Sequence, residues 1–112
     1  MASSERVVAA LALALAACRS EPGAPGSCTR DRDGACTEYP ADRATAGKRM
    51  CAGFTWREGA GTCPKESRLG TCTKEGGRVV DILYGGPPNH FTAATAEGAC
   101  TGAGGQWAAS TR

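Results

Sequence analysis

Six widely spaced cysteines limit what this chain of 112 residues can fold into more than any other feature. The closest two have seven residues between them, so the chain has no C-x-x-C redox motif and no close ligand pair of the kind found at zinc sites. An even number of such cysteines predicts structural disulfides, which persist only in an exported protein. These cysteines are Cys28, Cys36, Cys51, Cys63, Cys72 and Cys100.

Large apolar side chains are too few to hold a domain of this size together without crosslinks. Three disulfides would supply much of the missing stability, at about 2–4 kcal/mol each. The large apolar residues after Cys28 are Tyr39, Met50, Phe54, Trp56, Leu69, Val79, Val80, Ile82, Leu83, Tyr84, Phe91 and Trp107.

The cysteines also fall into two similar units, 28–62 and 63–112, within one domain. The sequence Gly-Ala-Cys-Thr at 34–37 resembles Gly-Thr-Cys-Thr at 70–73, and Ala-Thr-Ala precedes both Cys51 and Cys100. Each third cysteine is followed by a tryptophan. We therefore predict a duplicated unit in which Cys36 corresponds to Cys72 and Tyr39 corresponds to Tyr84.

Three cysteines in each unit require at least one disulfide between the units if all six are paired. The pattern most consistent with two like halves is Cys36–Cys51, Cys72–Cys100 and Cys28–Cys63. The sequential alternative is Cys28–Cys36, Cys51–Cys63 and Cys72–Cys100. Both patterns contain Cys72–Cys100, and six cysteines allow 15 pairings in all.

Alternation of apolar residues, turn residues and helix-start signals predicts a small, disulfide-stapled α+β domain. In each unit a strand, a helix and a second strand would follow one another, with one cysteine on a strand and another in the last turn of the helix. Pro40 suits the first position of one helix, and Asn89 or Thr92 the cap of the other. We expect strands at 35–39, 54–57, 69–73, 78–84 and 106–108, and helices at 40–51 and 91–100.

The second unit contains the better place to look for function, because 27 residues separate Cys72 from Cys100 where only 14 separate Cys36 from Cys51. The additional segment holds a Gly- and Pro-rich loop with two aromatic side chains, an amide and an imidazole. Such a loop is either a recognition element or a plain connector. Its candidate binding residues are Tyr84, Pro87, Pro88, Asn89, His90 and Phe91.

No residue pattern indicates catalysis, a metal or a cofactor. His90 is the only histidine, and a general base would need a nucleophile and an orienting partner, for which only Ser67 and Asp81 offer themselves without a recognisable spacing. Trp56 and Trp107 are either an aromatic binding surface or, as we favour, packing partners of their own disulfides. A net charge of +2 without a basic run does not suggest nucleic-acid binding.

The N-terminal segment predicts export. An apolar run from Val7 to Ala17 is too short to span a membrane and suits a signal peptide. The run ends in Leu-Ala-Ala-Cys at 15–18, which resembles the lipobox of bacterial lipoproteins. That resemblance implies cleavage after residue 17, acylation of Cys18 and a tether at 18–27. The alternatives are an ordinary secretory signal, or a buried apolar helix with an incidental cysteine. Arg19, rather than Asp, after the cysteine favours the outer membrane over the inner.

Three further motifs strengthen this resemblance. Cys-Thr-Glu-Tyr at 36–39, Gly-Thr-Cys-Pro at 61–64 and Cys-x-x-x-Gly-Gly-x-Trp at 100–107 resemble small cysteine-rich lipoproteins of unknown function from bacteria rich in Ala, Gly and Arg. The resemblance implies class and location, but no activity. We expect a membrane-anchored envelope lipoprotein that displays a non-enzymatic structural or interaction domain to an unidentified envelope partner. The alternative is a small inhibitor-like or hydrolase-like domain that uses the loop at 84–91.

Overall fold

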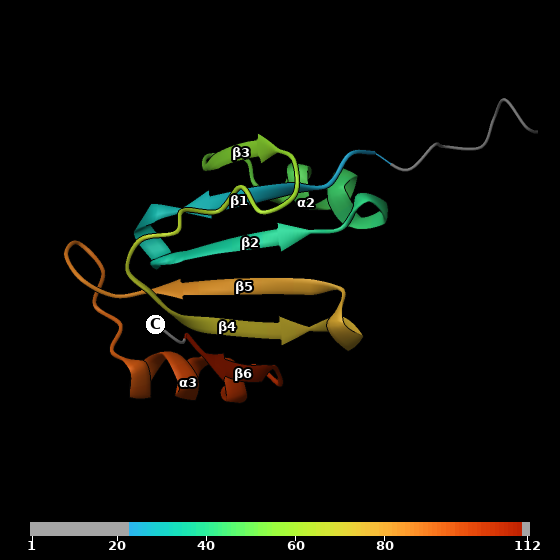
Figure 1. Ribbon diagram of the computed structural model, residues 1–112. Coiled ribbons are helices and arrows are strands. Elements are labelled where there is room, and N and C mark those ends of the chain that lie inside the picture. The colour runs from blue at the N-terminus through green and yellow to red at the C-terminus, as the bar shows by residue number, and fades with distance from the viewer. Residues whose placement is uncertain (1–22, 111–112) are drawn as a thin grey trace, which may run out of the picture.

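A six-stranded antiparallel sheet forms the body of the protein in the computed structural model, which describes residues 23–110 (Figure 1). The strand order is β3-β1-β2-β5-β4-β6, and two short helices pack on the sheet. The strands are β1 (Gly26–Arg30), β2 (Ala35–Tyr39), β3 (Thr55–Glu58), β4 (Arg68–Lys74), β5 (Val79–Tyr84) and β6 (Gln106–Ala109). The helices are α2 (Ala44–Met50) and α3 (Ala93–Gly102), and the 3-10 turns are η1 (Asp31–Asp33), η2 (Ala41–Arg43) and η3 (Glu75–Gly77).

The small mixed α/β domain with three disulfides is as predicted, and so are most of its elements, within one or two residues at their ends. The helix expected at 40–51 begins as the 3-10 turn η2, and Thr92 rather than Asn89 caps α3 through a capping box with Thr95. One strand was not predicted. β1 begins at Gly26, inside the stretch expected to be tether, and Ser27 is fully buried.

The chain follows the same element order twice, as β1-β2-α2-β3 and as β4-β5-α3-β6, and the two runs meet where β2 pairs with β5. Cys28 on β1 lies opposite Trp56 on β3, just as Cys72 on β4 lies opposite Trp107 on β6. The counterpart of Cys72 is therefore Cys28, and the predicted correspondence with Cys36 is wrong. Each run also has one more strand than the predicted strand–helix–strand order.

The disulfides follow from which face of the sheet each cysteine occupies. Cys28 lies opposite Thr37, and the next residue on β1, Thr29, lies opposite Cys36. Because successive side chains on a strand point to opposite faces, Cys28 faces the helices while Cys36 faces the other side. The predicted bonds Cys36–Cys51 and Cys28–Cys63 are therefore both wrong. The observed bonds are Cys28–Cys51, Cys36–Cys63 and the correctly predicted Cys72–Cys100.

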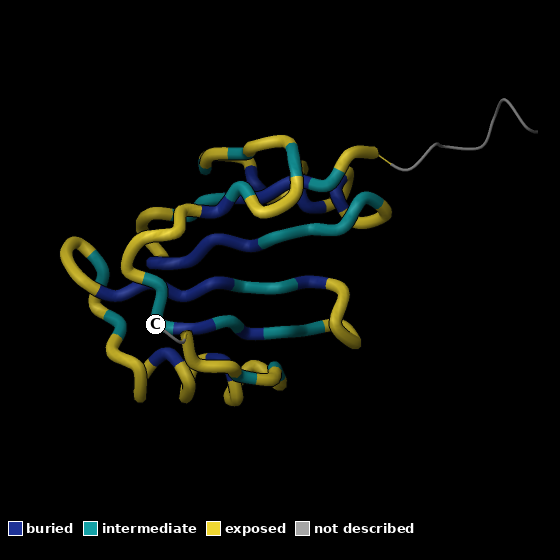
Figure 2. The backbone as a smooth tube through the Cα atoms, in the orientation of Figure 1, coloured by how far each residue is buried: buried dark blue, intermediate teal, exposed yellow. Residues whose placement is uncertain are grey.

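Each face of the sheet has its own small core, and the buried residues run through the inner strands (Figure 2). On the helix face, Ala96 of α3 packs with Ala35 and Leu83. On the opposite face, the segment between β3 and β4 covers the sheet and brings Cys63 into a cluster with Cys36, Ile82 and Tyr84. So few apolar side chains on either face explain why a covalent bond is needed on both.

A polar network occupies the helix face where the two runs meet. Thr37 donates a hydrogen bond of 2.6 Å to Asp81, directly across the β2–β5 ladder. The Asp81 carboxylate also forms ion pairs with the Lys74 ammonium at 2.7 Å and with the Arg30 guanidinium at 3.8 Å. Arg30 donates a hydrogen bond to the Thr37 hydroxyl as well. The Asp81 side chain is only 13% exposed, so the two cations offset the cost of burying its charge.

Candidate functional site

Three loops gather at one end of the sheet, which we call the loop end: residues 31–34, 64–67 and 85–91. Residues 31–34 follow β1, residues 64–67 precede β4, and residues 85–91 follow β5. The chain enters β1 from the opposite end, so that residues 23–25 and the loop 85–91 lie on opposite sides of the view in Figure 1. Two pockets share the loop end, and residues predicted from the sequence line both of them.

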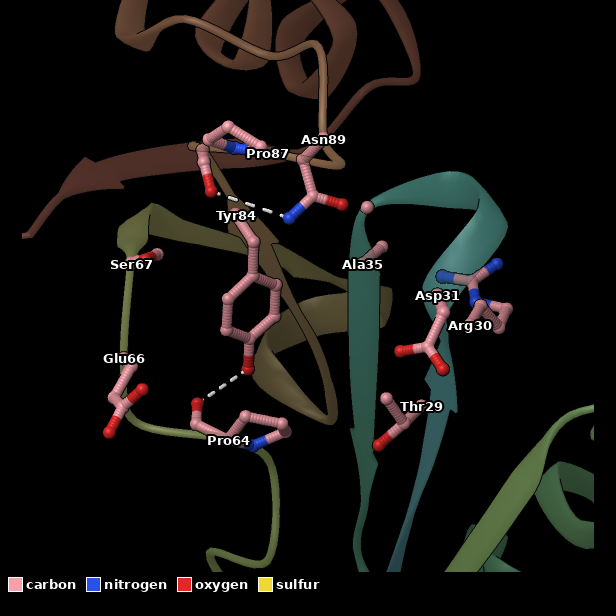
Figure 3. Close-up of a pocket in the computed structure, with 12 residues that line it drawn as sticks. Thr29, Arg30, Asp31, Ala35, Pro64, Glu66, Ser67, Tyr84, Pro87 and Asn89 are labelled. Carbon is pink, nitrogen blue, oxygen red and sulfur yellow. Dashed lines mark hydrogen bonds between the residues drawn. The ribbon is translucent and has the colours of Figure 1, made fainter.

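The first pocket measures about 240 Å³ and lies between the loops (Figure 3). One wall is the ring of Tyr84, whose hydroxyl donates a 2.7 Å hydrogen bond to the carbonyl of Pro64. Burial raises the pKa of Tyr84 above its ordinary value of 10.0, so the phenol stays protonated at neutral pH. Thr29 and Asp31 line the side across from Tyr84, and the other lining residues are Arg30, Gly34, Ala35, Glu66, Ser67, Gly85, Pro87 and Asn89.

Backbone contacts hold the pocket in shape. The amide of Gly85 donates to the carbonyl of Ser67 at 2.9 Å, which ties the loop 85–91 to the segment before β4. Arg68 fixes that segment further by donating to the carbonyls of Cys63 and Pro64. Ser67 has a φ of 62°, a left-handed conformation that is uncommon outside glycine and that tends to occur where function constrains the backbone.

The second pocket, of about 350 Å³, shares Asn89 with the first. Its lining is mainly apolar through Pro88 and Phe91, with His90, Thr95, Gly34, Arg32 and Asp33 around it. Two hydrogen bonds fix Asn89 between the two pockets. Its side-chain amide donates to the Gly85 carbonyl at 3.3 Å, and its backbone amide donates to the Gly86 carbonyl at 2.7 Å.

The loop 85–91 packs closely against Gly34. This glycine has a φ of +65°, and a Cβ built on it would lie 3.1 Å from the Asn89 side-chain oxygen and 3.2 Å from the Phe91 ring. A side chain at position 34 would push the loop away from the sheet. The close approach explains why glycine ends the η1 turn.

The six predicted loop residues therefore have different surroundings. Tyr84 is buried, and Phe91 is half-buried against the cluster of Ala35, Leu83 and Ala96. Pro87 lines the first pocket, Pro88 and His90 line the second, and Asn89 lines both. His90 is exposed.

The three side chains considered for catalysis do not come together. His90 and Ser67 line different pockets, and Asp81 lies in the network on the helix face. None of the side-chain hydrogen bonds among residues 23–110 joins any two of them. The geometry needed for an activated nucleophile is not present among these residues.

The two tryptophans pack against other residues of the domain. Trp56 stacks at a tilt on Tyr39, with ring centroids 5.8 Å apart, and its ring covers Gly26. Trp107 covers Gly70 and packs against the cluster of Ala35, Leu83 and Ala96. Both are half-buried, and neither lines a pocket at the loop end.

The part of the first pocket that comes from β1 and from the other two loops was not predicted from the sequence. It includes Thr29, Asp31 and Pro64, and Ser67 was named only as a possible nucleophile. These residues are far from the loop 85–91 in sequence, and no spacing motif connects them. The only local signal was the turn sequence Asp-Arg-Asp-Gly at 31–34, which ends in the glycine that seats the loop.

Comparisons with known proteins add no family assignment: the chain matches no protein-family model, no curated protein and no solved structure. Within residues 23–110, no group of three or more His, Cys, Asp or Glu side chains is arranged to hold a metal ion. No helix in the same range is long and apolar enough to cross a membrane. Cys18, and with it the predicted signal and acylation, lies outside the described residues.

Proposed function

We propose that this chain is a bacterial envelope lipoprotein, anchored through acylated Cys18, that presents the loop end of a disulfide-linked domain to a partner. The observation that carries the proposal is that the chain enters the sheet at the end opposite the loop 85–91 (Figure 1), and residues of that loop line the two loop-end pockets. A domain tethered by its entry segment exposes the loop end away from the membrane. The outer membrane is the proposed location, because Arg19 rather than Asp follows the cysteine.

The proposed role is binding rather than catalysis. Support comes from pockets of about 240 and 350 Å³ that combine apolar walls with a few fixed polar groups, as small binding sites do. Further support comes from the separation of His90, Ser67 and Asp81, the three side chains considered for catalysis.

We also propose that the domain arose by duplication of a strand–strand–helix–strand unit. Gly-Ser-Cys-Thr-Arg-Asp at 26–31 corresponds to Gly-Thr-Cys-Thr-Lys-Glu at 70–75, position by position through β1 and β4. The third disulfide, Cys36–Cys63, has no counterpart within the second run and joins the two. The loop 85–91 would then be an acquired feature of the second copy.

Fractionation of cells tests the anchor. Wild-type protein is expected in the membrane fraction, resistant to high salt and released by detergent, whereas Cys18→Ser should yield unprocessed or soluble protein. Equal membrane retention of the two proteins would refute the acyl anchor.

Site-specific photo-crosslinking in intact cells tests the loop end. A photoreactive residue at His90 is expected to give an adduct with an envelope component, and the same residue at Glu75, in the η3 turn at the opposite end of the sheet, is not. Adding Asn89→Ala should weaken the adduct from position 90, because Asn89 lines both pockets. Identical adducts from both positions, or none from position 90, would refute binding at the loop end.

A further inference from the structure

Helix α2 carries exposed basic residues that the fold does not require. Lys48, Arg49 and Met50 form its last turn, and the helix contains no acidic residue. All three are exposed, and Met50, at 67%, is the one large hydrophobic residue of the described chain that is exposed.

The second helix shows that the fold does not require this surface. α2 and α3 have equivalent positions, each bonded by a disulfide to a strand and each packing a small residue, Gly47 or Ala96, against the sheet. When Cys51 is aligned with Cys100, the counterparts of Lys48, Arg49 and Met50 are Glu97, Gly98 and Ala99. The same structural role is therefore filled by an acidic helix in one half and by a basic helix in the other.

The basic helix is the one beside the chain entry. A Cβ built on Gly23 would lie 3.8 Å from the Thr45 hydroxyl. A shallow pocket of about 420 Å³ lies between Gly23, Ala24 and the α2 side chains Thr45, Lys48 and Arg49, and its remaining lining residues are Ala44, Trp56 and Glu58. Cys18 precedes Gly23 by five residues. Five Cα–Cα steps of 3.8 Å reach at most about 19 Å, so an anchor at Cys18 holds α2 near the membrane surface.

We propose that the α2 surface, defined as Thr45, Lys48 and Arg49, rests on anionic lipid headgroups of the membrane that anchors Cys18. This inference rests on the proposed function, because the anchor supplies the proximity. The ion pair between Lys48 and Glu58, 3.7 Å long, is no obstacle, since both side chains are more than 60% exposed and such pairs contribute little. Basic residues close to an anionic bilayer are attracted to it.

The two tryptophans provide paired probes of this contact. Trp56 lies in the pocket beside Lys48 and Arg49, and Trp107 has the equivalent place at the far edge of the sheet. Variants Trp107→Phe and Trp56→Phe each leave one of them. The mature acylated protein is placed in vesicles of phosphatidylcholine, with or without phosphatidylglycerol, that contain a headgroup spin label. The expected result is quenching of Trp56 fluorescence in anionic vesicles only, with Trp107 unaffected in both.

A charge variant and a matched control test the cause. Lys48→Gln with Arg49→Gln should lower the ratio of docked to undocked domain roughly 30-fold and abolish the quenching. Lys65→Gln removes a charge from an exposed position of the loop end that lines neither pocket, and it should leave the quenching unchanged. Hydrogen exchange of the wild-type protein gives a second readout, in which residues 44–51 exchange more slowly on anionic vesicles alone.

The inference is overturned if both tryptophans are quenched alike, if neutral vesicles give the same quenching, or if the charge variant still docks. The mass of the same preparation shows whether Cys18 is acylated, which tests the proposed function separately. If acyl chains are missing, the free Cys18 thiol is coupled to a maleimide-bearing lipid, and the contact of α2 with the vesicle is measured as before.

Discussion

Replacing the two glycines that lie beneath the tryptophans should reveal how closely the edge strands are packed. In Gly26→Ala, the new Cβ would lie 2.2 Å from the nearest Trp56 ring carbon. In Gly70→Ala, it would lie 2.5 Å from the Trp107 ring and also 2.5 Å from the backbone carbonyl of Ala108. Real Cβ contacts are not this short, so the neighbouring atoms must move in both variants.

The two variants should differ in cost, because different atoms must move. The Trp56 ring is half-buried and lines an open pocket, so it can tilt away from position 26. The Ala108 carbonyl belongs to the β4–β6 pairing, so position 70 gains room only if the edge strand shifts. Overpacking usually costs 1–3 kcal/mol, and we expect about 1 kcal/mol for Gly26→Ala and about 3 kcal/mol for Gly70→Ala.

Urea unfolding of the disulfide-bonded protein measures both costs, and a double-mutant cycle identifies their source. In a Trp56→Ala background, Gly26→Ala should cost almost nothing. In a Trp107→Ala background, Gly70→Ala should keep most of its cost, because the Ala108 carbonyl remains. Equal costs for the two alanines, or full rescue of Gly70→Ala by Trp107→Ala, would refute this account of the packing.

Three further predictions concern stability. Asp81→Asn should lower the free energy of unfolding in urea by about 2 kcal/mol, because Arg30 and Lys74 lose the anion that they share. Glu58→Gln, in the exposed pair with Lys48, should lower it by less than about 0.5 kcal/mol. Similar costs for the two variants would contradict a stabilising role of the network around Asp81. Cys36→Ala with Cys63→Ala opens a bridge that spans 27 residues and should lower the unfolding free energy by about 3.5 kcal/mol, and a loss below about 1 kcal/mol would be inconsistent with a structural role. Burial raises the pKa of Tyr39 and Tyr84 above 10.0, so the unfolded chain loses these phenolic protons first as the pH rises. Stability is therefore fully present below about pH 10 and should fall above it, and absorbance at alkaline pH should show the tyrosines titrating above 10.0 until the protein unfolds.

The sequence predicted those elements that have a local signal. β5 contains a run of Val, Ile, Leu and Tyr, so a strand was expected where it lies. β1 was missed because Gly-Ser-Cys-Thr-Arg contains no large apolar residue. Its place between β2 and β3 comes from pairing with distant residues, which local periodicity does not reveal.

Missing β1 also led to the wrong disulfides. Without β1, Cys36 was the first cysteine on a predicted strand. It was therefore paired with Cys51, which in the structure bonds Cys28. Alternation along β1 and β2 puts Cys28 and Cys36 on opposite faces, but this is evident only when the register is known. The match of residues 26–31 with residues 70–75 was present in the sequence and would have supplied that register.

The candidate site was predictable only in its loop. Asn89 and His90 were recognised because their segment is rich in Gly and Pro. The rest of the first pocket comes from the β1–β2 turn, with Asp31, and from the segment before β4, with Ser67, and the proximity of both to the loop depends on the whole strand order.

A peptide map of the unreduced protein purified from cell envelopes reports the acyl anchor and the disulfides together. We expect an N-terminal Cys18 that carries acyl chains, together with linked peptides for Cys28–Cys51, Cys36–Cys63 and Cys72–Cys100. A chain that retains residues 1–17, with Cys18 unmodified and free thiols at the other six cysteines, would contradict this expectation.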